Sequence, residues 1–227
     1  MKQKPERGTF ALPDFNIMVL VSGNGTNLQA MLNAGKAGIF NLDNTTVKIA
    51  LVVSDCPGVY ALERAKAAGV PSFVAEPDKT IPLAERREKL SNHILRLAET
   101  KHIDLIVLAG FLSILTGSII TQYSGRMINL HPALLPKFGG AGMYGERVHR
   151  AVLDAGETES GCTVHLVDAG TDTGTIVLQR TVPVLPDDTP VTLAERIHRE
   201  EHIAIVEAVK MLLSSMRAFL LFANKLL

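Results

Sequence analysis

The stretch IDLIVLAGF, residues 103–111, is nearly all apolar. A strand with one face in water alternates apolar and polar residues, whereas a continuous apolar run is typical of a strand covered on both faces. The segments NIMVLV (16–21) and TVKIALVVS (46–54) have the same character. These runs predict parallel strands at the centre of a sheet that carries helices on both faces.

Helical patterns alternate with these strands along the first half of the chain. Helices are expected over 26–38, 59–69, 83–102 and 115–125, with further strands over 70–76 and 126–131. Such alternation predicts an α/β fold with a parallel sheet.

The second half of the chain predicts a change in the sheet. The segments GCTVHLVD (161–168) and TIVLQRTVPV (175–184) flank a short polar turn with glycine, so they predict an antiparallel hairpin. A last helix is expected to begin near Thr189. With no repeat and no convincing linker, residues 1–227 are expected to form a single domain.

The composition limits the possible partners. Among 227 residues, Lys+Arg and Asp+Glu both number 23, and this zero net charge argues against a nucleic-acid partner. Two cysteines make neither a disulfide framework nor a Cys-rich zinc site, and reduced thiols are typical of a cytoplasmic protein.

Both ends of the chain argue against a membrane protein. Residues 1–15 are expected to form a flexible leader without the apolar stretch of a signal peptide. The apolar tail 211–227 is too short and too interrupted to span a bilayer. It is expected to pack on the body or on a second subunit, which leaves a monomer and a homodimer both open.

A glycine loop, VSGNGTNLQAM, follows the first strand and opens the first helix. Gly23 and Gly25 fit the dinucleotide pattern G-x-G-x-x-G, but Leu28 stands at the third position. No Gly-Lys-Ser/Thr follows, which excludes a phosphate-loop NTPase. Free N–H groups at the helix start suit a single phosphate, with hydrogen bonds added by Thr26 and Asn27. A plain turn capped by Thr26 or Asn27 is an equally good interpretation of these residues.

The stretch MINLHPALLPKF places Asn129 and His131 at the end of a strand. Ligands bind at the carboxyl ends of parallel strands, and side chains two residues apart point to the same face. An amide donor beside a titratable imidazole suits the stabilisation of an oxyanion during a proton transfer. In the alternative, Asn129 caps a turn and His131 is a satisfied core histidine. The strand-end location and the amide partner favour the functional interpretation.

The remaining histidines carry weaker signals. Four of them lie in helical or surface-like segments and are expected to be solvated: His93, His102, His149 and His198. His165 is expected in the core or beside the site. No H-E-x-x-H motif occurs, so no metal site is predicted.

The turn DAGTDTG supplies two candidate carboxylates, Asp168 and Asp172. A general acid or base histidine benefits from a carboxylate that orients it or raises its pKa, but aspartates also simply solvate turns. The residues alone do not choose between these roles. Further charged candidates, typical of a solvated helix face, are Arg86, Arg87, Glu200 and Glu201.

Four segments, VSGNGTNLQAM, DLIVLAGFLSIL, MINLHPALLPKF and GCTVHLVDAGTDTGTIVLQ, occur in the order and spacing of a known family. Over roughly residues 16–210 the chain resembles the phosphoribosylglycinamide formyltransferases, which are folate-dependent enzymes of purine biosynthesis. The Asn-x-His-Pro-x-Leu-Leu-Pro stretch is shared by the wider group of 10-formyltetrahydrofolate-using hydrolases and transferases. The Ser-Gly-Asn-Gly-Thr-Asn loop narrows the resemblance to the purine-biosynthesis family. The resemblance implies a Rossmann-like formyltransferase fold, 10-formyltetrahydrofolate as co-substrate and no metal.

The resemblance also implies a reaction. The amine of glycinamide ribonucleotide attacks the formyl carbon, and a tetrahedral intermediate collapses to formylated product and tetrahydrofolate. His131 would be the general acid/base and, when protonated, would stabilise the oxyanion, to which Asn129 would donate. The family's essential aspartate falls on Asp172 rather than Asp168, where it would raise the pKa of His131 and help relay the proton.

Binding roles follow from the same resemblance. Gly25, Thr26 and Asn27 would hold the ribonucleotide phosphate, and Glu201 would contact the ribonucleotide. The folate pocket would be lined by Arg87, Leu112, Ser113, Ile114, Leu115 and Asn129. Two departures stand out: residues 138–150 form a longer loop than in shorter members, and many members have a basic residue in place of Ser113.

Related activities fit less well. A 10-formyltetrahydrofolate hydrolase, which releases formate, normally carries an N-terminal regulatory domain that is not expected here. A methionyl-tRNA formyltransferase needs a further RNA-binding domain and an excess of Lys and Arg over Asp and Glu. A binding module without catalysis would not need Asn129, His131 and Asp172 together, and an ATP-using transformylase would need a nucleotide loop.

Overall fold

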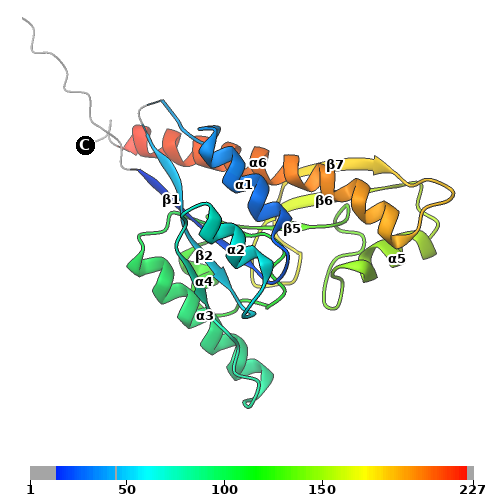
Figure 1. Cartoon of the computed structure of the whole chain (residues 1–227), viewed down its shortest axis with the longest axis horizontal. Helices are drawn as coiled ribbons and strands as arrows, with labels where there is room; N and C mark the ends of the chain where they lie inside the picture. The colour runs from blue at the N-terminus through cyan, green and yellow to red at the C-terminus, as the bar shows by residue number, and fades with distance from the viewer. Residues whose placement is uncertain (1–13, 44, 224–227) are drawn as a thin grey trace, which may run out of the picture.

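A seven-stranded sheet in the order β3-β2-β1-β4-β5-β6-β7 forms the centre of the computed structural model, which describes residues 14–43 and 45–223 (Figure 1). The strands are β1 (Phe15–Val21), β2 (Val47–Ser54), β3 (Ser72–Val74), β4 (Leu105–Leu108), β5 (Met127–His131), β6 (Glu159–Leu166) and β7 (Ile176–Pro183). The helices are α1 (Thr26–Lys36), α2 (Tyr60–Ala67), α3 (Leu83–Thr100), α4 (Ser118–Gln122), α5 (Glu146–Asp154) and α6 (Pro190–Ala223).

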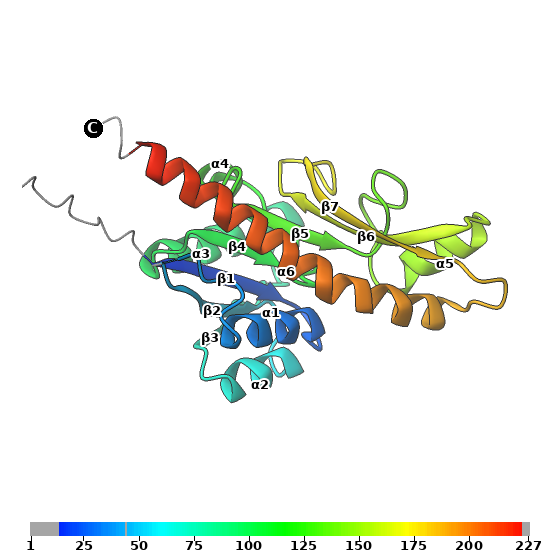
Figure 2. The ribbon, with the colours of Figure 1, turned by 90° about the horizontal axis from the view of Figure 1, so that it is seen from above.

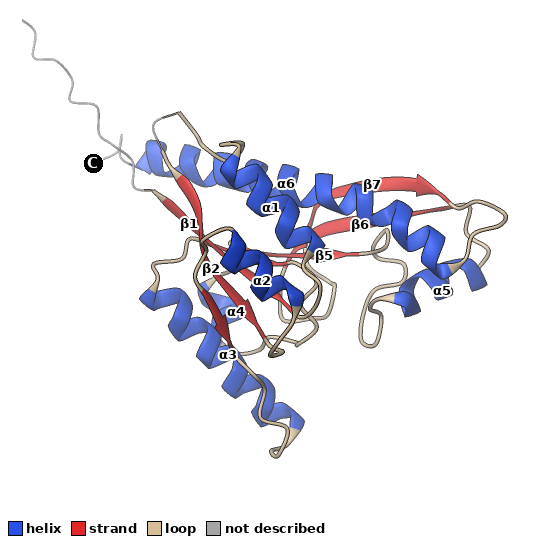
Figure 3. Ribbon diagram, viewed as in Figure 1, coloured by secondary structure: helices blue, strands red, loops and turns tan. Residues whose placement is uncertain are grey.

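The direction of the strands confirms the predicted mixed sheet. Strands β3, β2, β1, β4 and β5 run parallel, while β6 is antiparallel to both β5 and β7. The polar turn between β6 and β7 therefore makes the expected hairpin (Figure 3). All four residues of β4 are buried, as its continuous apolar run predicts.

Two apolar layers cover the two faces of the sheet. Along β1, alternate side chains enter opposite layers: Ile17 and Val19 face one, and Met18 and Leu20 face the other. Helices α1, α2 and α6 pack on the first face, and α3 and α4 pack on the second (Figure 2). The expected helices on both faces are thus confirmed.

Helix α5 is an element that the sequence did not predict. Residues 138–150 were expected to form a loop, but a helix begins at Glu146, directly after Gly145. Its apolar contribution to the core comes from Val148 and Val152, one helical turn apart. Two buried valines after a glycine-rich segment are a weak helical pattern, so the sequence predicted a loop here.

The described ends of the chain correct the end of the expected leader, and they place the first part of the tail on the body of the protein, one of the two expected positions. Phe15 is the first residue of β1 and is buried, so the leader does not extend to it; residues 1–13 lie outside the described part. Residues 211–223 continue α6, where Leu213 is buried and Leu220 packs against the core, while Phe219 is 71% exposed. Residues 224–227 lie outside the described part.

None of the helices built from the described residues has the length and apolar character needed to cross a membrane.

Candidate active site

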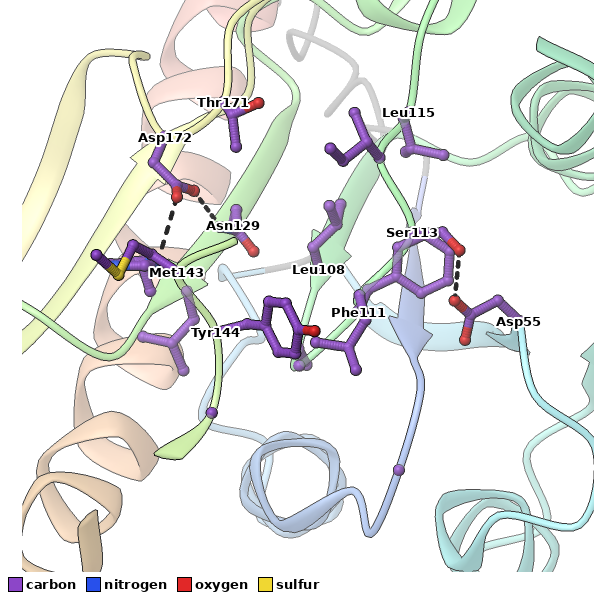
Figure 4. Close-up of a pocket in the computed structure, with 18 of the residues that line it drawn as sticks. Asp55, Leu108, Phe111, Ser113, Leu115, Asn129, Met143, Tyr144, Thr171 and Asp172 are labelled. Carbon is purple, nitrogen blue, oxygen red and sulfur yellow. Dashed lines mark hydrogen bonds and ion pairs between the residues drawn. The ribbon is translucent and has the colours of Figure 1, made fainter. Parts of the chain in front are cut away.

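A cavity of about 900 Å³ opens at the carboxyl ends of the parallel strands (Figure 4). Its walls come from the glycine loop after β1, the segment after β4, the end of β5, the start of α5 and the β6–β7 turn. This is where open α/β sheets bind ligands, because the loops that leave the strands converge there. All the residues predicted for the site from the resemblance line this one cavity: Gly25, Thr26, Asn27, Arg87, Leu112, Ser113, Ile114, Leu115, Asn129, His131, Asp172 and Glu201.

The carboxylate of Asp172 connects the polar side chains at one end of the cavity. Its Oδ2 accepts a hydrogen bond from the backbone N–H of Gly140 at 2.9 Å and lies 3.5 Å from Nδ1 of His131. Its Oδ1 accepts from Nδ2 of Asn129 at 3.3 Å and lies 3.4 Å from Nε2 of His165. Asp172 also has a left-handed backbone, with φ of 57°, a conformation that aspartate tolerates better than most residues. The turn thus aims its carboxylate at three side chains of the neighbouring strands.

The imidazole of His131 is buried with oxygen acceptors beside both nitrogens. Nε2 lies 2.8 Å from the carbonyl oxygen of Phe138, and Nδ1 faces Asp172. Burial lowers the pKa of His131, and the Asp172 carboxylate and the Phe138 carbonyl oppose this effect without overcoming it. The expected upward influence of Asp172 is therefore present, but the net shift is downward. At neutral pH the neutral ring therefore carries its hydrogen on Nε2, which donates to the Phe138 carbonyl, and has its free lone pair on Nδ1, beside Asp172.

Asp172 itself stays ionised. Burial is the largest single influence and raises the pKa of its carboxyl group, but the backbone N–H of Gly140 and the neighbouring imidazoles of His165 and His131 together lower it. A charged carboxylate next to a neutral imidazole can stabilise the imidazolium once a proton arrives.

His165 orients Asn129. The carbonyl of Leu166 can only accept a hydrogen bond, so Nδ1 of His165, 2.9 Å away, donates to it. In the tautomer with hydrogen on Nδ1, Nε2 accepts from Nδ2 of Asn129 at 3.1 Å. The amide hydrogens of Asn129 thus face His165 and Asp172. The expectation that His165 lies in the core or beside the site is confirmed.

Asp168 has a different environment from Asp172. It is exposed, and its Oδ1 accepts hydrogen bonds from the backbone N–H of Gly170 and from the hydroxyl of Thr173, at 3.0 and 2.7 Å. These contacts stabilise the turn. The geometry assigns Asp168 to the loop and Asp172 to the polar cluster.

At the other end of the cavity, the glycine loop meets α6. Nδ2 of Asn27 donates to Oε2 of Glu201 at 3.0 Å, across 174 residues of sequence. Glu201 is buried rather than part of a solvated face; burial raises its pKa, against the influence of Asn27 and His198. Gly25 occupies the N-cap position of α1, so neither Thr26 nor Asn27 does, which removes the simple-cap interpretation.

Two contacts fix the segment after β4, which forms the predicted folate wall. The backbone N–H of Leu112 donates to the hydroxyl of Ser22 at 2.8 Å. The hydroxyl of Ser113 donates to Oδ2 of Asp55 at 2.6 Å. Sequence reasoning missed Asp55, although a polar residue directly after β2 is a candidate by the strand-end rule.

His149 corrects another expectation. It was expected to be solvated, but only 2% of it is exposed, and it lines the cavity from α5. Burial, followed by the nearby His198 and His131, lowers its pKa to about 4. His149 was misjudged because the helix that carries it was not predicted.

The sequence and the fold of the chain are similar to those of known proteins. A family model described as formyl transferase matches residues 15–209. Phosphoribosylglycinamide formyltransferase of Dictyostelium discoideum is 38% identical over 210 residues, which cover 87% of this chain and 98% of that protein. The crystal structure of glycinamide ribonucleotide transformylase 1 from Symbiobacterium toebii superposes with a TM-score of 0.78, at 36% identity and 89% coverage of each chain.

Longer proteins also contain a similar segment. The trifunctional purine biosynthetic protein adenosine-3 of Drosophila melanogaster is 41% identical over 198 residues, which cover 87% of this chain. The chain spans 14% of the length of that protein and of its two other insect relatives.

Proposed function

The chain belongs to the formyl transferase family, and we propose that it transfers the formyl group of 10-formyltetrahydrofolate to the amine of glycinamide ribonucleotide. One observation carries the proposal: a single cavity holds the Asn129–His131–Asp172 cluster at one end and the Asn27–Glu201 pair at the other. Relatives of similar length that are named phosphoribosylglycinamide formyltransferase support this substrate. Both cysteines are free thiols, which supports a cytoplasmic setting.

The reaction begins with attack of the substrate amine on the formyl carbon. The new C–N bond forms as the carbonyl π electrons move to oxygen, and neutral His131 accepts the proton that the amine nitrogen loses. Ionised Asp172, 3.5 Å away, stabilises the resulting imidazolium. Collapse of the tetrahedral intermediate breaks the bond to N10 of the folate, and His131 returns the proton to that leaving nitrogen.

Asn129 is the proposed donor to the oxyanion. Its amide hydrogens face Asp172 at 3.3 Å and His165 at 3.1 Å. The contact to Asp172 is the longer of the two, so a small rotation exchanges it for the oxyanion while the contact to His165 is kept. The Asn129 amide, already oriented by His165, then stabilises the negative charge that develops on the formyl oxygen.

The two substrates occupy opposite parts of the cavity in this proposal. The ribonucleotide phosphate binds the N–H groups at the start of α1, from Gly25 to Asn27, and Glu201 accepts hydrogen bonds from the ribose. The folate lies along residues 112–115, near Arg87. The amine of one and the formyl group of the other then meet beside His131.

The proposal is tested with purified protein and 10-formyltetrahydrofolate, with and without glycinamide ribonucleotide. Folate absorbance follows cofactor consumption, and mass spectrometry identifies the formylated product. We expect turnover only when the ribonucleotide is present. Release of formate without the ribonucleotide would contradict the proposal and identify a hydrolase.

A further inference from the structure

We propose that Arg64 on α2 is a positioning residue that holds the glycine loop in its phosphate-binding shape. This inference rests on the proposed function, which assigns the ribonucleotide phosphate to that loop. Nε of Arg64 donates to the carbonyl oxygen of Asn24 at 2.8 Å, and one terminal nitrogen donates to Oδ1 of the same residue at 3.0 Å. The other terminal nitrogen donates to Oε1 of Gln29 at 3.1 Å. One rigid guanidinium therefore joins the loop, through Asn24, to the first turn of α1.

The start of α2 supports the same loop at two further points. The backbone N–H of Ala61 donates to the carbonyl oxygen of Gly23 at 3.2 Å. A Cβ on Gly25 would lie 2.6 Å from Cβ of Ala61 and 3.5 Å from Cδ of Arg64. The backbone of Gly25 is thus pressed against α2, with a positive φ of 75° that glycine adopts freely. Arg64 provides the side-chain part of this support.

The guanidinium is held from its own helix as well. Its carbon lies 4.7 Å from the centre of the Tyr60 ring, a cation–π contact that limits its movement. Its three acceptors are neutral amide oxygens, and no carboxylate among the residues of the described chain forms an ion pair with it. An uncompensated positive charge therefore stands beside the N-terminus of α1, where both favour an anion.

The planar shape and the positive charge of the Arg64 side chain can be tested separately for their effect on ribonucleotide binding. Arg64→Met keeps an extended side chain and removes the hydrogen bonds and the charge, whereas Arg64→Lys keeps the charge and loses the planar fork. Because hydrogen bonds to a charged donor are the stronger class, we expect Arg64→Met to raise the KM for the ribonucleotide about tenfold while kcat changes less than about twofold. Because the planar fork positions the loop, we expect Arg64→Lys to raise the ribonucleotide KM about as much as Arg64→Met does. The KM for 10-formyltetrahydrofolate stays at its wild-type value in both.

Arg96→Met on α3 is the matched control, because Arg96 is exposed and far along the chain from the loop. An unchanged ribonucleotide KM in Arg64→Met would overturn the inference. So would a wild-type KM in Arg64→Lys, which would leave charge as the only contribution. Equal losses for both substrates together with a lower Tm would show a general structural role instead.

A second measurement separates this inference from the proposed function. Inorganic phosphate is titrated into wild-type protein and Arg64→Met by NMR, with the amide signals of residues 23–27 as the readout. We expect saturable shifts in the wild type and weaker binding in the variant. If the wild type shows these shifts but no ribonucleotide-dependent turnover, the function is wrong and the loop assignment stands. If the wild type shows no shifts, the inference falls even when turnover is normal.

Discussion

At the scale of single residues, the site depends on how one turn presents one carboxylate. Asp168 and Asp172 lie four residues apart in the same turn, yet only Asp172 reaches the strand-end cluster. The choice is made by the left-handed backbone at Asp172 and by the N–H of Gly140, which comes from a distant segment. Residue types alone cannot reveal such an arrangement. It was the resemblance to a family, not the composition of the turn, that selected Asp172.

Replacing Asp172 by Asn tests its electrostatic role. The carboxylate raises the pKa of His131 against the effect of burial, so its removal lowers that pKa further. The His131 imidazole then stays unprotonated to lower pH, so the acidic limb of the kcat/KM profile should move to lower pH. Turnover should fall by about 100-fold or more, because the imidazolium loses its counter-ion. A pH–rate profile measures both effects.

Asp168→Asn is the matched control for that variant. Its carbonyl oxygen can still accept from Gly170 and Thr173, so the turn should be preserved. We expect a profile that overlies the wild type. An unchanged acidic limb in Asp172→Asn would remove Asp172 from the proposed role.

At the scale of elements, the strands were predictable and α5 was not. Continuous apolar runs identify buried strands such as β1 and β4, because both faces of each are covered. Helix α5 has only nine residues, and it packs against α6, which lies much later in the sequence. The sequence around α5 therefore gives little sign that its apolar side chains are buried. The error carried over to His149, whose burial depends on that helix. Short helices whose partner is distant in sequence are poorly predicted for this reason.

The burial of His149 predicts a pH dependence of stability. Its folded pKa of about 4 lies below the ordinary value of 6.5, so protonation favours the unfolded chain. This contribution is present above pH 6.5 and is lost as the pH falls toward 4. Between pH 7 and pH 5 the wild type should lose about 2 kcal/mol through this one group. Urea unfolding at both pH values measures the loss.

His149→Gln provides the comparison, because glutamine is polar and does not titrate. His131 and His202 also have lowered pKa values and contribute in the same direction in both proteins. The variant should therefore lose less stability than the wild type between pH 7 and pH 5, whatever its stability at pH 7. Equal losses would mean that His149 titrates normally.

The end of α6 gives a second test at this scale. Leu213 is completely buried, whereas Phe219, six residues later on the same helix, is 71% exposed. Leu213→Ala should cost about 2–4 kcal/mol of the free energy of unfolding, because it leaves a cavity in the core. Phe219→Ala should change stability by less than about 0.5 kcal/mol. Equal small effects in urea unfolding would mean that residues 211–223 do not pack on the body.

At the scale of the whole molecule, the cavity is assembled from both halves of the chain. The parallel half supplies the glycine loop and the segment after β4, and the hairpin and α6 supply Asp172 and Glu201. The Asn27–Glu201 contact joins the two halves at the proposed phosphate end of the cavity, and the Asn129–Asp172 contact joins them at the proposed reacting end. Motifs in the sequence were enough to predict these residues as site candidates. That they line one cavity is seen only in the folded structure.

In the proposed reaction, proton transfer takes place at His131. The most direct measurement is single-turnover transfer of an isotope-labelled formyl group to glycinamide ribonucleotide by wild type and His131→Ala, with ribonucleotide affinity measured in parallel. We expect transfer to fall by about 100- to 10,000-fold in His131→Ala, while affinity for the ribonucleotide stays nearly unchanged because the proposed phosphate end of the cavity is separate. Transfer at the wild-type rate in His131→Ala would contradict the proposed role of His131.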